Sequence, residues 1–566
     1  MQLYLDNVPV EAECGETLLT LVKRAGMDAE GLDMKPLAAQ IAGAIYTLNN
    51  NPIQNTEAGP QPRRVVRDAG GRIKLLRYGD DLGKRVYERT LQYVLLMALR
   101  QLWPGARVNV RYSLGPGVYM TVDKEPALCK ADIAELKARC QSIIDADLPL
   151  IRERLDIGEA IAFFQKEGQD DKVRLLKWRK FGYFDCYRQG DFLDYFYGEM
   201  APSTGYLKVF DLQFVDPGLV MLMPDEKNPD RAGVYKNSPK FAAVFAQSDE
   251  WGKLLHCDTV AELNEMVETG SVRELVRINE ALHEKSYAGI ADAIVQRGGR
   301  AVMVAGPSSS GKTTSANRLY THLRVLGKNP ALISLDNYYI DRDKLLPDEN
   351  GEIDLESIDT LDVARFNQDL ERLLQGELVE TPVFDFLTAR RAPKGRKLLL
   401  GKDQPLIIEG IHGLNPRMIS PSIPKDSVFR VYVSALTTLN LDDHNRIRTT
   451  DIRLLRRMVR DHETRGASVE HTMSMWPSVQ RGEQTWIFPY QEQADALFNT
   501  ALVYEPAVLK RYIFPLLLMV TEESPYYAAV RSVIKFLNYF QEADVEDEIP
   551  PTSILREFIG GNTFYR

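Results

Sequence analysis

The chain has 566 residues, of which 44% are hydrophobic and 26% are charged, and its net charge at pH 7 is −9. This composition is typical of a folded protein with several domains. The acidic balance argues against a protein that coats nucleic acid or an anionic membrane with its whole surface.

The N-terminal sequence, "MQLYLDNVPVEAECGE", lacks the basic and apolar regions of a secretory signal. The longest apolar run, residues 513–520, is too short to cross a bilayer. The five cysteines are scattered and form no Cys-x-x-Cys pair, which indicates a reducing compartment without disulfides or structural zinc. We therefore expect a cytoplasmic protein without a membrane partner.

Residues 1–62 form the first predicted unit, a small α+β domain. "QLYLDNVPVEA" predicts a hairpin, "TLLTLVKRAG" a helix that ends at a glycine, and "LAAQIAGAIYTL" a return strand. "NNNPIQNTEAGPQPRR" has the composition of a linker.

A second α+β unit is predicted over residues 76–225, with a helix in "KRVYERTLQYVLLMALRQLW" that Pro104 and Gly105 end. Residues 226–284 are expected to be linker and helix, and "ELVRINEALHEKSYAGIADAIVQRGG" predicts one long helix. Strands and helices alternate over 285–500, which favours an α/β domain with a parallel sheet, and 501–566 predict a helical extension.

A phosphate-binding loop is the strongest motif of the chain. Gly306, Gly311, Lys312 and Thr313 complete the pattern G-x-x-x-x-G-K-T between the apolar strand "AVMVAG" and a helix. Backbone N–H groups of such a loop point at phosphate oxygens, the lysine reaches the β and γ phosphates, and the threonine hydroxyl coordinates Mg²⁺. The predicted ATP-binding residues are Gly306, Ser308, Ser309, Ser310, Gly311, Lys312, Thr313 and Thr314.

The next predicted strand ends at Asp336, in "PALISLDNYYIDRD". Ligands of parallel sheets bind where the strands end, so this carboxylate is placed to take a proton from an attacking hydroxyl. A capping or turn aspartate is the alternative that the residue alone leaves open.

Over about 285–500 the chain resembles the uridine kinase and phosphoribulokinase family. The matching stretches are "GPSSSGKTT", "SLDNYY", "GEIDLESIDTLD", "TPVFDFLTARR", "LIIEGIHGLNP" and "DIRLLRRMVRDHETRG". The resemblance implies ATP and Mg²⁺ as cofactors, Asp336 as general base, Glu409 with Thr313 as metal ligands, and an acceptor pocket. That pocket's predicted residues are Tyr339, Asp354, Phe384, Phe386 and Arg391.

The stretch "RIRTTDIRLLRRMVRDHETRG" predicts an amphipathic helix with a basic face. A solvated basic face is one interpretation; beside a phosphate loop, guanidinium groups that close over phosphates are the other. The resemblance points to Arg457, Arg460 and Arg465 as catalytic residues together with Lys312.

Four positions depart from the uridine kinases. Their base-reading histidine corresponds to Ala389, and the tyrosine before their aspartate corresponds to Phe384. An arginine after the basic helix corresponds to Ala467, and a glutamine further on to Met475. A pocket that lacks these hydrogen-bonding groups discriminates poorly for a pyrimidine, so uridine itself is not implied.

The first half resembles the TGS domain and the second, editing-type domain of threonyl-tRNA synthetases, through "GETLLTLVKRAG", "YERTLQYVLLMALRQLWPGARVNVRYSLGPGVYMTVD" and "DYFYGEMAPSTGYLKVFDL". That family's three histidines and cysteine align with Tyr93, Met97, Phe196 and Met200. The first histidine of the chain is His256. We therefore expect these four side chains to fill an apolar core instead of binding a metal.

Two functions remain open. One is an ATP-dependent kinase that phosphorylates a primary hydroxyl of a nucleoside-like small molecule. The other is a regulatory ATP-binding protein that senses RNA or the translation machinery through residues 1–225. Asp336, Asp354 and the arginines favour the kinase, because a switch needs no acceptor pocket. The sequence leaves open oligomer formation and an RNA or regulator contact through the first half.

Overall fold

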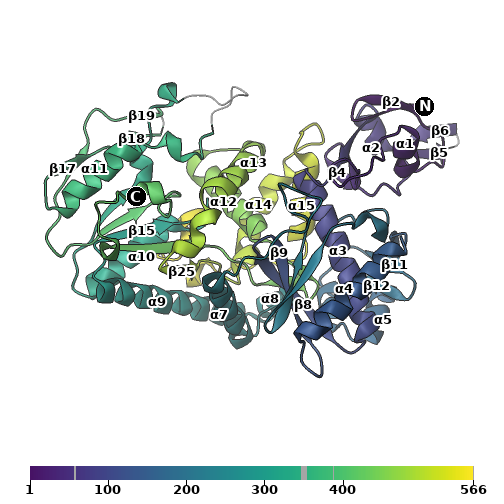
Figure 1. Cartoon of the computed structure of the whole chain (residues 1–566), viewed down its shortest axis with the longest axis horizontal. Coiled ribbons are helices and arrows are strands. Elements are labelled where there is room, and N and C mark those ends of the chain that lie inside the picture. The colour runs from purple at the N-terminus through teal and green to yellow at the C-terminus, as the bar shows by residue number, and fades with distance from the viewer. Residues whose placement is uncertain (57–58, 346–353, 387, 565–566) are drawn as a thin grey trace.

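The computed structural model describes residues 1–56, 59–345, 354–386 and 388–564 (Figure 1). A small N-terminal lobe stands apart from the rest, and the yellow C-terminal helices lie in the middle of the molecule. The predicted class, an α/β protein with several domains and a parallel sheet, is confirmed. Among the described residues, no helix combines the length and apolar character that crossing a membrane requires.

The N-terminal lobe is a five-stranded sheet in the order β2-β1-β7-β3-β4. Its hairpin β1–β2 and helix α1 confirm the prediction. Its central strand β7 lies beyond the predicted range 1–62 and pairs in parallel with β1. The elements are β1 (Gln2–Leu5), β2 (Val8–Glu11), α1 (Leu18–Arg24), β3 (Ala38–Ile41), β4 (Ala44–Tyr46), α2 (Arg64–Asp68) and β7 (Arg72–Leu76).

Two predictions in this lobe are wrong. The single return strand is a hairpin, β3–β4, because Ala42 and Gly43 both adopt positive φ (48° and 80°), as a tight two-residue turn requires. The predicted linker contains a second hairpin, in which β5 (Ile53–Thr56) pairs with β6 (Gly59–Pro62).

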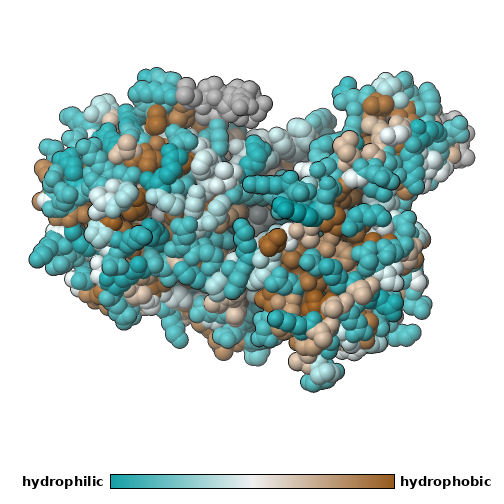
Figure 2. Space-filling model, viewed as in Figure 1, coloured by the Kyte–Doolittle hydropathy of each residue, from teal (hydrophilic) through white to brown (hydrophobic). Residues whose placement is uncertain are grey.

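The second unit packs α3 (Asp81–Leu102) and α4 (Lys130–Asp145) against an antiparallel sheet in the order β13-β14-β9-β8. As predicted, α3 ends just before Pro104. The remaining elements are β8 (Arg107–Leu114), β9 (Gly117–Asp123), β10 (Ile151–Asp156), α5 (Ile157–Lys166), α6 (Asp170–Leu176), β11 (Tyr183–Gln189), β12 (Phe192–Asp194), β13 (Asp211–Val215) and β14 (Gly218–Leu222). Figure 2 shows hydrophobic surface gathered over this unit.

Three helices follow: α7 (Pro239–Leu255), α8 (Val260–Thr269) and α9 (Val272–Arg297). The long helix is confirmed, and Gly298 ends it with positive φ (72°). Since α9 runs through residue 285, a domain boundary there would cut a helix.

The third unit is a five-stranded parallel sheet in the order β16-β21-β15-β22-β25. Its strands are β15 (Ala301–Ala305), β16 (Ala331–Ser334), β21 (Leu406–Glu409), β22 (Val428–Ser434) and β25 (Ala496–Asn499). The helices are α10 (Lys312–Val325), α11 (Val363–Leu374), α12 (Thr449–Arg465) and α13 (Val469–Trp486). Short pairs join β17 (Val379–Thr381) to β20 (Arg396–Leu398), β18 (Phe384–Asp385) to β19 (Arg390–Arg391) and β23 (Asn440–Asp442) to β24 (Asn445–Arg446).

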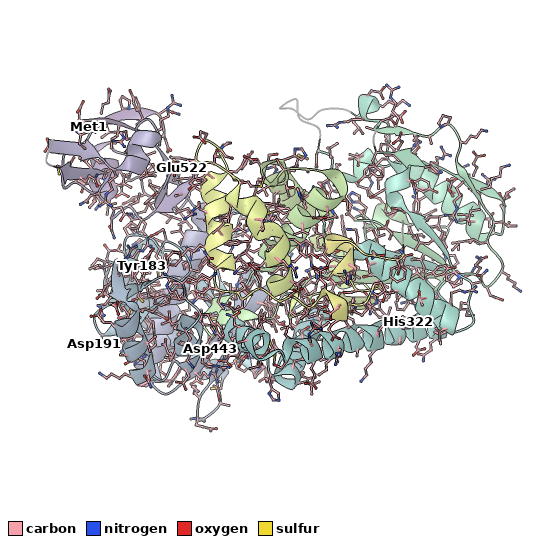
Figure 3. All side chains as sticks on the ribbon, turned by 180° about the vertical axis from the view of Figure 1, so that it is seen from behind. Met1, Tyr183, Asp191, His322, Asp443 and Glu522 are labelled. Carbon is pink, nitrogen blue, oxygen red and sulfur yellow. The ribbon has the colours of Figure 1, made fainter. Side chains whose placement is uncertain are left out.

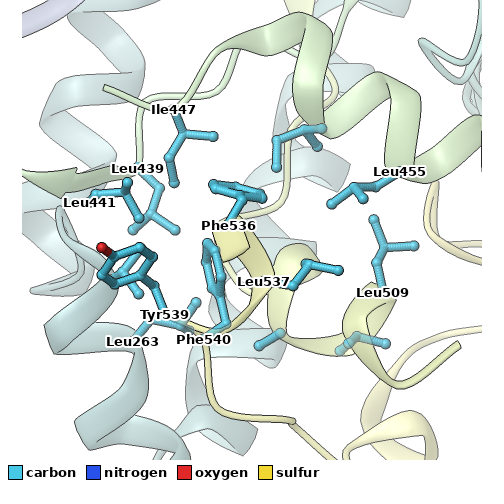
Figure 4. Packing of buried hydrophobic residues seen from close by; sticks show 14 of the residues in the cluster. Leu263, Leu439, Leu441, Ile447, Leu455, Leu509, Phe536, Leu537, Tyr539 and Phe540 are labelled. Atoms are coloured by element: carbon cyan, nitrogen blue, oxygen red, sulfur yellow. The ribbon is translucent and has the colours of Figure 1, made fainter. Parts of the chain in front are cut away.

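The C-terminal extension lies inside the molecule. Its helices α14 (Glu505–Leu518), α15 (Tyr527–Leu537) and α16 (Arg556–Ile559) share one hydrophobic cluster with α5, α6, α8, α9 and α12. Figure 4 shows Phe536, Leu537 and Phe540 of this cluster packed together with Leu263 and Leu455. The extension is therefore the core that joins the N-terminal half to the parallel sheet.

Candidate active site

The phosphate loop connects β15, a fully buried strand, to the N-terminus of α10. A side chain at Gly306 would meet the Val433 carbonyl oxygen at 2.0 Å, and Gly311 adopts φ +83°. Both positions therefore require glycine. Among the described residues, the buried hydroxyls of Ser309 and Ser310 have no hydrogen-bond partner. These orphaned groups and the helix N-terminus fit a bound phosphate.

Two predicted carboxylates meet at the carboxyl edge of the sheet. Glu409 ends β21, where its register partners are Ser334 of β16 and Val304 of β15. Asp336 lies two residues beyond Ser334 and donates its backbone N–H to that hydroxyl at 3.3 Å. The end of β15 leads directly into the phosphate loop, so both carboxylates lie beside it, as the sequence predicts.

Electrostatic interactions join these carboxylates to Lys312. The Lys312 ammonium group donates to the Pro307 carbonyl at 3.0 Å. Burial lowers the pKa of Lys312, and the charges of Glu409 and Asp336 oppose that shift. Burial raises the pKa of Asp336, which Lys312 counteracts. Burial, helped by the charge of Asp336, raises the pKa of Glu409 to about 7. The protonation of each acid therefore depends on the charges of the other acid and of Lys312.

The arginine helix α12 lies across the loop. Arg457 donates to the Ser308 hydroxyl at 2.9 Å. Arg457, Arg460 and Arg465 surround the buried carboxylate of Asp461, at 3.3, 2.8 and 3.2 Å. The charges of Arg465 and Arg460 also lower the pKa of Asp336, so these predicted guanidiniums face the same site.

Two further arginines of α12, to which the sequence analysis assigned no role, donate hydrogen bonds to backbone carbonyls of the loop. Arg453 donates to the Ser308 carbonyl at 2.9 Å and pairs with Glu483. Arg456 donates to the Thr500 carbonyl at 2.8 Å and pairs with Glu505 at 2.6 Å. Their spacing of three residues, one turn from Arg457 and Arg460, is the signal that could have found them.

The predicted acceptor residues divide into two groups. Tyr339, Phe384 and Phe386 form an aromatic cluster with ring centroids 5.2 to 6.3 Å apart, and Phe386 is 65% exposed. Arg391 instead holds the chain beside the general base: it donates to the carbonyls of Tyr338 and Tyr339 at 3.0 Å and pairs with Asp362. Its guanidinium is engaged with these partners, and its role as an acceptor-binding residue stays a prediction.

Asp354 lies next to residues 346–353, which fall outside the described part. Its carboxylate accepts from the Trp486 indole at 3.3 Å and from the Glu356 backbone at 3.0 Å. Two groups near it escaped sequence reasoning. Burial raises the pKa of Glu356 to about 7, against the charge of Arg457. Burial lowers the pKa of His412 to about 4, so its imidazole is neutral at pH 7.

The C-terminal segment covers the loop. Glu557 accepts from the backbone N–H of Thr314 at 3.2 Å and from its hydroxyl at 2.6 Å. The Ile554 side chain lies against Gly311, 2.9 Å from where a Cβ would stand. A carboxylate thus lies at the N-terminus of α10, which favours anions.

The donor set fits Mg²⁺. Within the described part of the chain, no three His, Cys, Asp or Glu side chains converge on a metal position. Mg²⁺ in phosphoryl-transfer sites takes one or two carboxylates and completes its shell with phosphate and water. Thr313 and Glu409 are the residues of this chain that would hold the ion.

In the N-terminal half, Tyr93, Met97, Phe196 and Met200 are 0 to 4% exposed and belong to one hydrophobic cluster. The Tyr93 and Phe196 rings meet edge to face at 5.9 Å, and the Tyr93 hydroxyl donates to the Tyr187 carbonyl at 3.2 Å. They pack as a core, as we expected.

The part of the chain that contains this site matches the model of a known protein family. Residues 301–504 match the model of the Phosphoribulokinase / Uridine kinase family. This is a little more than a third of the chain, and it includes the phosphate loop, Asp336, Glu409 and α12. The chain therefore contains a P-loop domain of the kinase type.

The N-terminal part is similar to threonine–tRNA ligases. That of Carboxydothermus hydrogenoformans is 34% identical over 143 residues, 25% of this chain and 23% of the ligase. That of Syntrophomonas wolfei subsp. wolfei is 26% identical over 210 residues, 37% of this chain and 32% of the ligase. The chain spans about a quarter to a third of the length of these relatives.

A solved structure described as a "Possible Uridine Kinase from Bacillus stearothermophilus" is 20% identical; the match covers 36% of this chain and 89% of that chain. The TM-score between the two structures is 0.23.

Proposed function

We propose that the protein is an ATP-dependent kinase that transfers the γ-phosphoryl group to a primary hydroxyl of a nucleoside-like small molecule. The observation that carries this proposal is the position of Asp336. It is a partly buried carboxylate just beyond the end of β16, and it interacts electrostatically with Lys312 of the phosphate loop and with Arg460 and Arg465 of α12. A protein that only binds nucleotide needs no carboxylate there.

The loop amides and Lys312 would hold the phosphates of ATP, and Thr313 with Glu409 would hold Mg²⁺. The ion, when bound, supplies positive charge to the phosphate oxygens. Asp336 orients the acceptor hydroxyl and takes its proton while the hydroxyl oxygen bonds to the γ phosphorus. The bond from that phosphorus to the bridging oxygen breaks, and ADP leaves. Arg457, Arg460 and Arg465 stabilise the charge on the transferring group.

The predicted acceptor residues and their neighbours support a nucleoside-like acceptor. Aromatic rings at Tyr339, Phe384 and Phe386 offer a surface on which a flat ring can stack. Carboxylates at Asp354 and Glu356 accept hydrogen bonds from sugar hydroxyls. Ala389 adopts positive φ (53°) where uridine kinases carry a base-reading histidine. A nucleoside-like molecule that is not selected as a pyrimidine fits this set.

A regulatory role is the second candidate. The similarity of the N-terminal part to threonine–tRNA ligases favours it, because those proteins act on tRNA by name. In that case ATP hydrolysis would respond to tRNA or ribosomes and ignore small acceptors. Both candidates place the protein in the cytoplasm.

The test is ADP formation by the purified full chain with ATP, Mg²⁺ and a panel of nucleosides and sugar alcohols. Asp336→Asn should lower transfer about 10²- to 10⁴-fold without weakening ATP binding, because it removes a general base and no phosphate contact. Asp359→Asn is the matched control, since Asp359 is exposed and its carboxylate pairs with Arg417 at 2.7 Å. Turnover that tRNA stimulates and no acceptor changes would refute the kinase.

A further inference from the structure

The hairpin β23–β24 links the parallel sheet to the arginine helix. It leaves β22, enters the N-terminal half, and returns into α12, which begins at Thr449. Asp443 at its tip, labelled in Figure 3, lies where the N-terminal half meets the other units. The hairpin and the start of α12 therefore depend on contacts from residues far away in the sequence.

A buried group of charges holds the hairpin. Lys172 lies 3.2 Å from Asp194 and 3.5 Å from Asp442, and the His444 ring nitrogen lies 2.6 Å from Asp194. Lys172, Asp194 and Asp442 are at most 1% exposed. Removing one partner from such a group leaves a buried charge uncompensated. Lys172 and Asp194 come from the N-terminal half, while Asp442 and His444 come from the hairpin, so neither side is complete alone.

Backbone contacts fix the same hairpin. Val110 donates its N–H to the Asp443 carbonyl at 2.8 Å, and Asn440 donates to the Val110 carbonyl at 2.8 Å. The Gln92 side chain donates to the His444 carbonyl at 2.7 Å. These bonds set the hairpin's position as well as its charge environment.

Glu88 holds the residue at which α12 starts. It is a buried carboxylate on α3 that pairs with Arg446 at 3.0 Å and with Arg448, the N-cap residue of α12, at 3.1 Å. Although burial opposes it, the charges of Arg448 and Arg446 lower the pKa of Glu88 to about 2. Glu88 is thus ionised throughout the physiological range.

We propose that the N-terminal half positions the arginine helix for phosphoryl transfer, with Glu88, Lys172 and Asp194 as its positioning residues. This inference rests on the proposed kinase function. Arg460 lies about 18 Å along the helix from Arg448, at 1.5 Å per residue. A small tilt at the start of α12 is therefore enlarged at the guanidinium, and displacements of about 1 Å are enough to slow a reaction about 10²-fold.

The test compares three variants of the full chain. Glu88→Gln keeps the shape and removes the charge that holds Arg448. Glu153→Gln removes an ion pair with Arg188 inside the same half, away from the hairpin. Leu96→Ala destabilises α3 through its core face and leaves Glu88 in place. Measured well below the unfolding temperature, kcat should fall at least tenfold for Glu88→Gln alone, while its Kd for ATP stays within about threefold of wild type.

Amide hydrogen exchange across residues 449–465 gives a readout that needs no turnover. We expect faster exchange in this helix for Glu88→Gln and wild-type exchange for Glu153→Gln. If Glu88→Gln does not fold, Gln92→Met, which removes only the bond to His444, should show the same changes at smaller size. Unchanged kcat and exchange in a folded variant, or an equal loss of kcat in Leu96→Ala, would overturn the proposal. A wild-type protein that phosphorylates no acceptor overturns the kinase function instead, and exchange still decides the positioning.

Discussion

Two buried sites of the molecule, one in each half, are built in opposite ways. Around the phosphate loop, the buried side chains include Glu409, Arg453, Arg456 and Glu483, which are at most 7% exposed. At the positions of the N-terminal half that align with the synthetases' metal-like site, Tyr93, Met97, Phe196 and Met200 are buried to the same degree and carry no charge. Burying charge costs free energy unless partners compensate it. The site at the phosphate loop keeps its buried charges in pairs, whereas these four positions of the N-terminal half are filled by apolar packing.

The difference teaches how to interpret similarity to a known enzyme. The N-terminal half keeps a sequence 34% identical to a ligase over 143 residues, yet its side chains at the metal-like positions are a packed core. Similarity in sequence therefore does not by itself carry a chemical role, and the side chains at the site have to be examined one by one.

The largest effect should come from Lys312. Lys312→Ala removes the ammonium group from a site that holds two carboxylates, the partly buried Asp336 and the buried Glu409. We expect turnover to fall by about 100-fold or more, with weaker ATP binding, because preorganised charge supplies most of the catalysis of phosphoryl transfer. Steady-state ADP formation and titration calorimetry with ATP measure both. Near-normal turnover would mean that the charges around the phosphate loop do not take part in the reaction.

A core substitution tests the other side of the comparison. Met97→Ala should lower the free energy of unfolding of the N-terminal half by about 2–5 kcal/mol, the cost of truncating a buried apolar side chain. ATP affinity should remain at the wild-type value. Urea unfolding followed by fluorescence measures the first, and calorimetry the second. A large loss of activity in a variant of normal stability would show that the apolar pocket still has a chemical role.

The smallest effect concerns the acid that covers the loop. Glu557→Gln should tighten ATP binding by about tenfold, since one carboxylate charge within a few ångströms of a phosphate costs about 1 kcal/mol or more. Glu548→Gln is the control, because Glu548 lies on the same segment and pairs with Arg273 and Arg277 instead. Weaker ATP binding in Glu557→Gln would contradict this expectation, because it would mean that Glu557 helps to bind the nucleotide.

Much of this architecture can be predicted from the sequence, because its signals are local. The phosphate loop, its flanking strand and helix, and the amphipathic face of α12 each follow from spacing within about twenty residues. The position of Asp336 follows too, since parallel strands end at one edge.

The remaining features depend on contacts between distant residues. Arg391 matches an acceptor-binding position in sequence, yet its guanidinium holds the Tyr338 and Tyr339 carbonyls. Nothing in the sequence around Glu88 distinguishes it from other helix residues. Its partners Arg446 and Arg448 lie 358 and 360 residues later in the chain. Likewise, β7 joins a sheet whose other strands end at Tyr46. The spacing of residues along the sequence does not predict partners at such a distance.

The contact between Glu557 and Thr314 joins residues 243 positions apart. A ribosome that makes about 5–20 residues per second needs roughly 10 to 50 seconds to cover that distance. During this interval the loop is already synthesised, while Ile554 and Glu557 are still missing from its surface. During part of every round of translation, the phosphate loop of the nascent chain is therefore uncovered and the central hydrophobic core is incomplete. Chaperone binding is most useful at this stage.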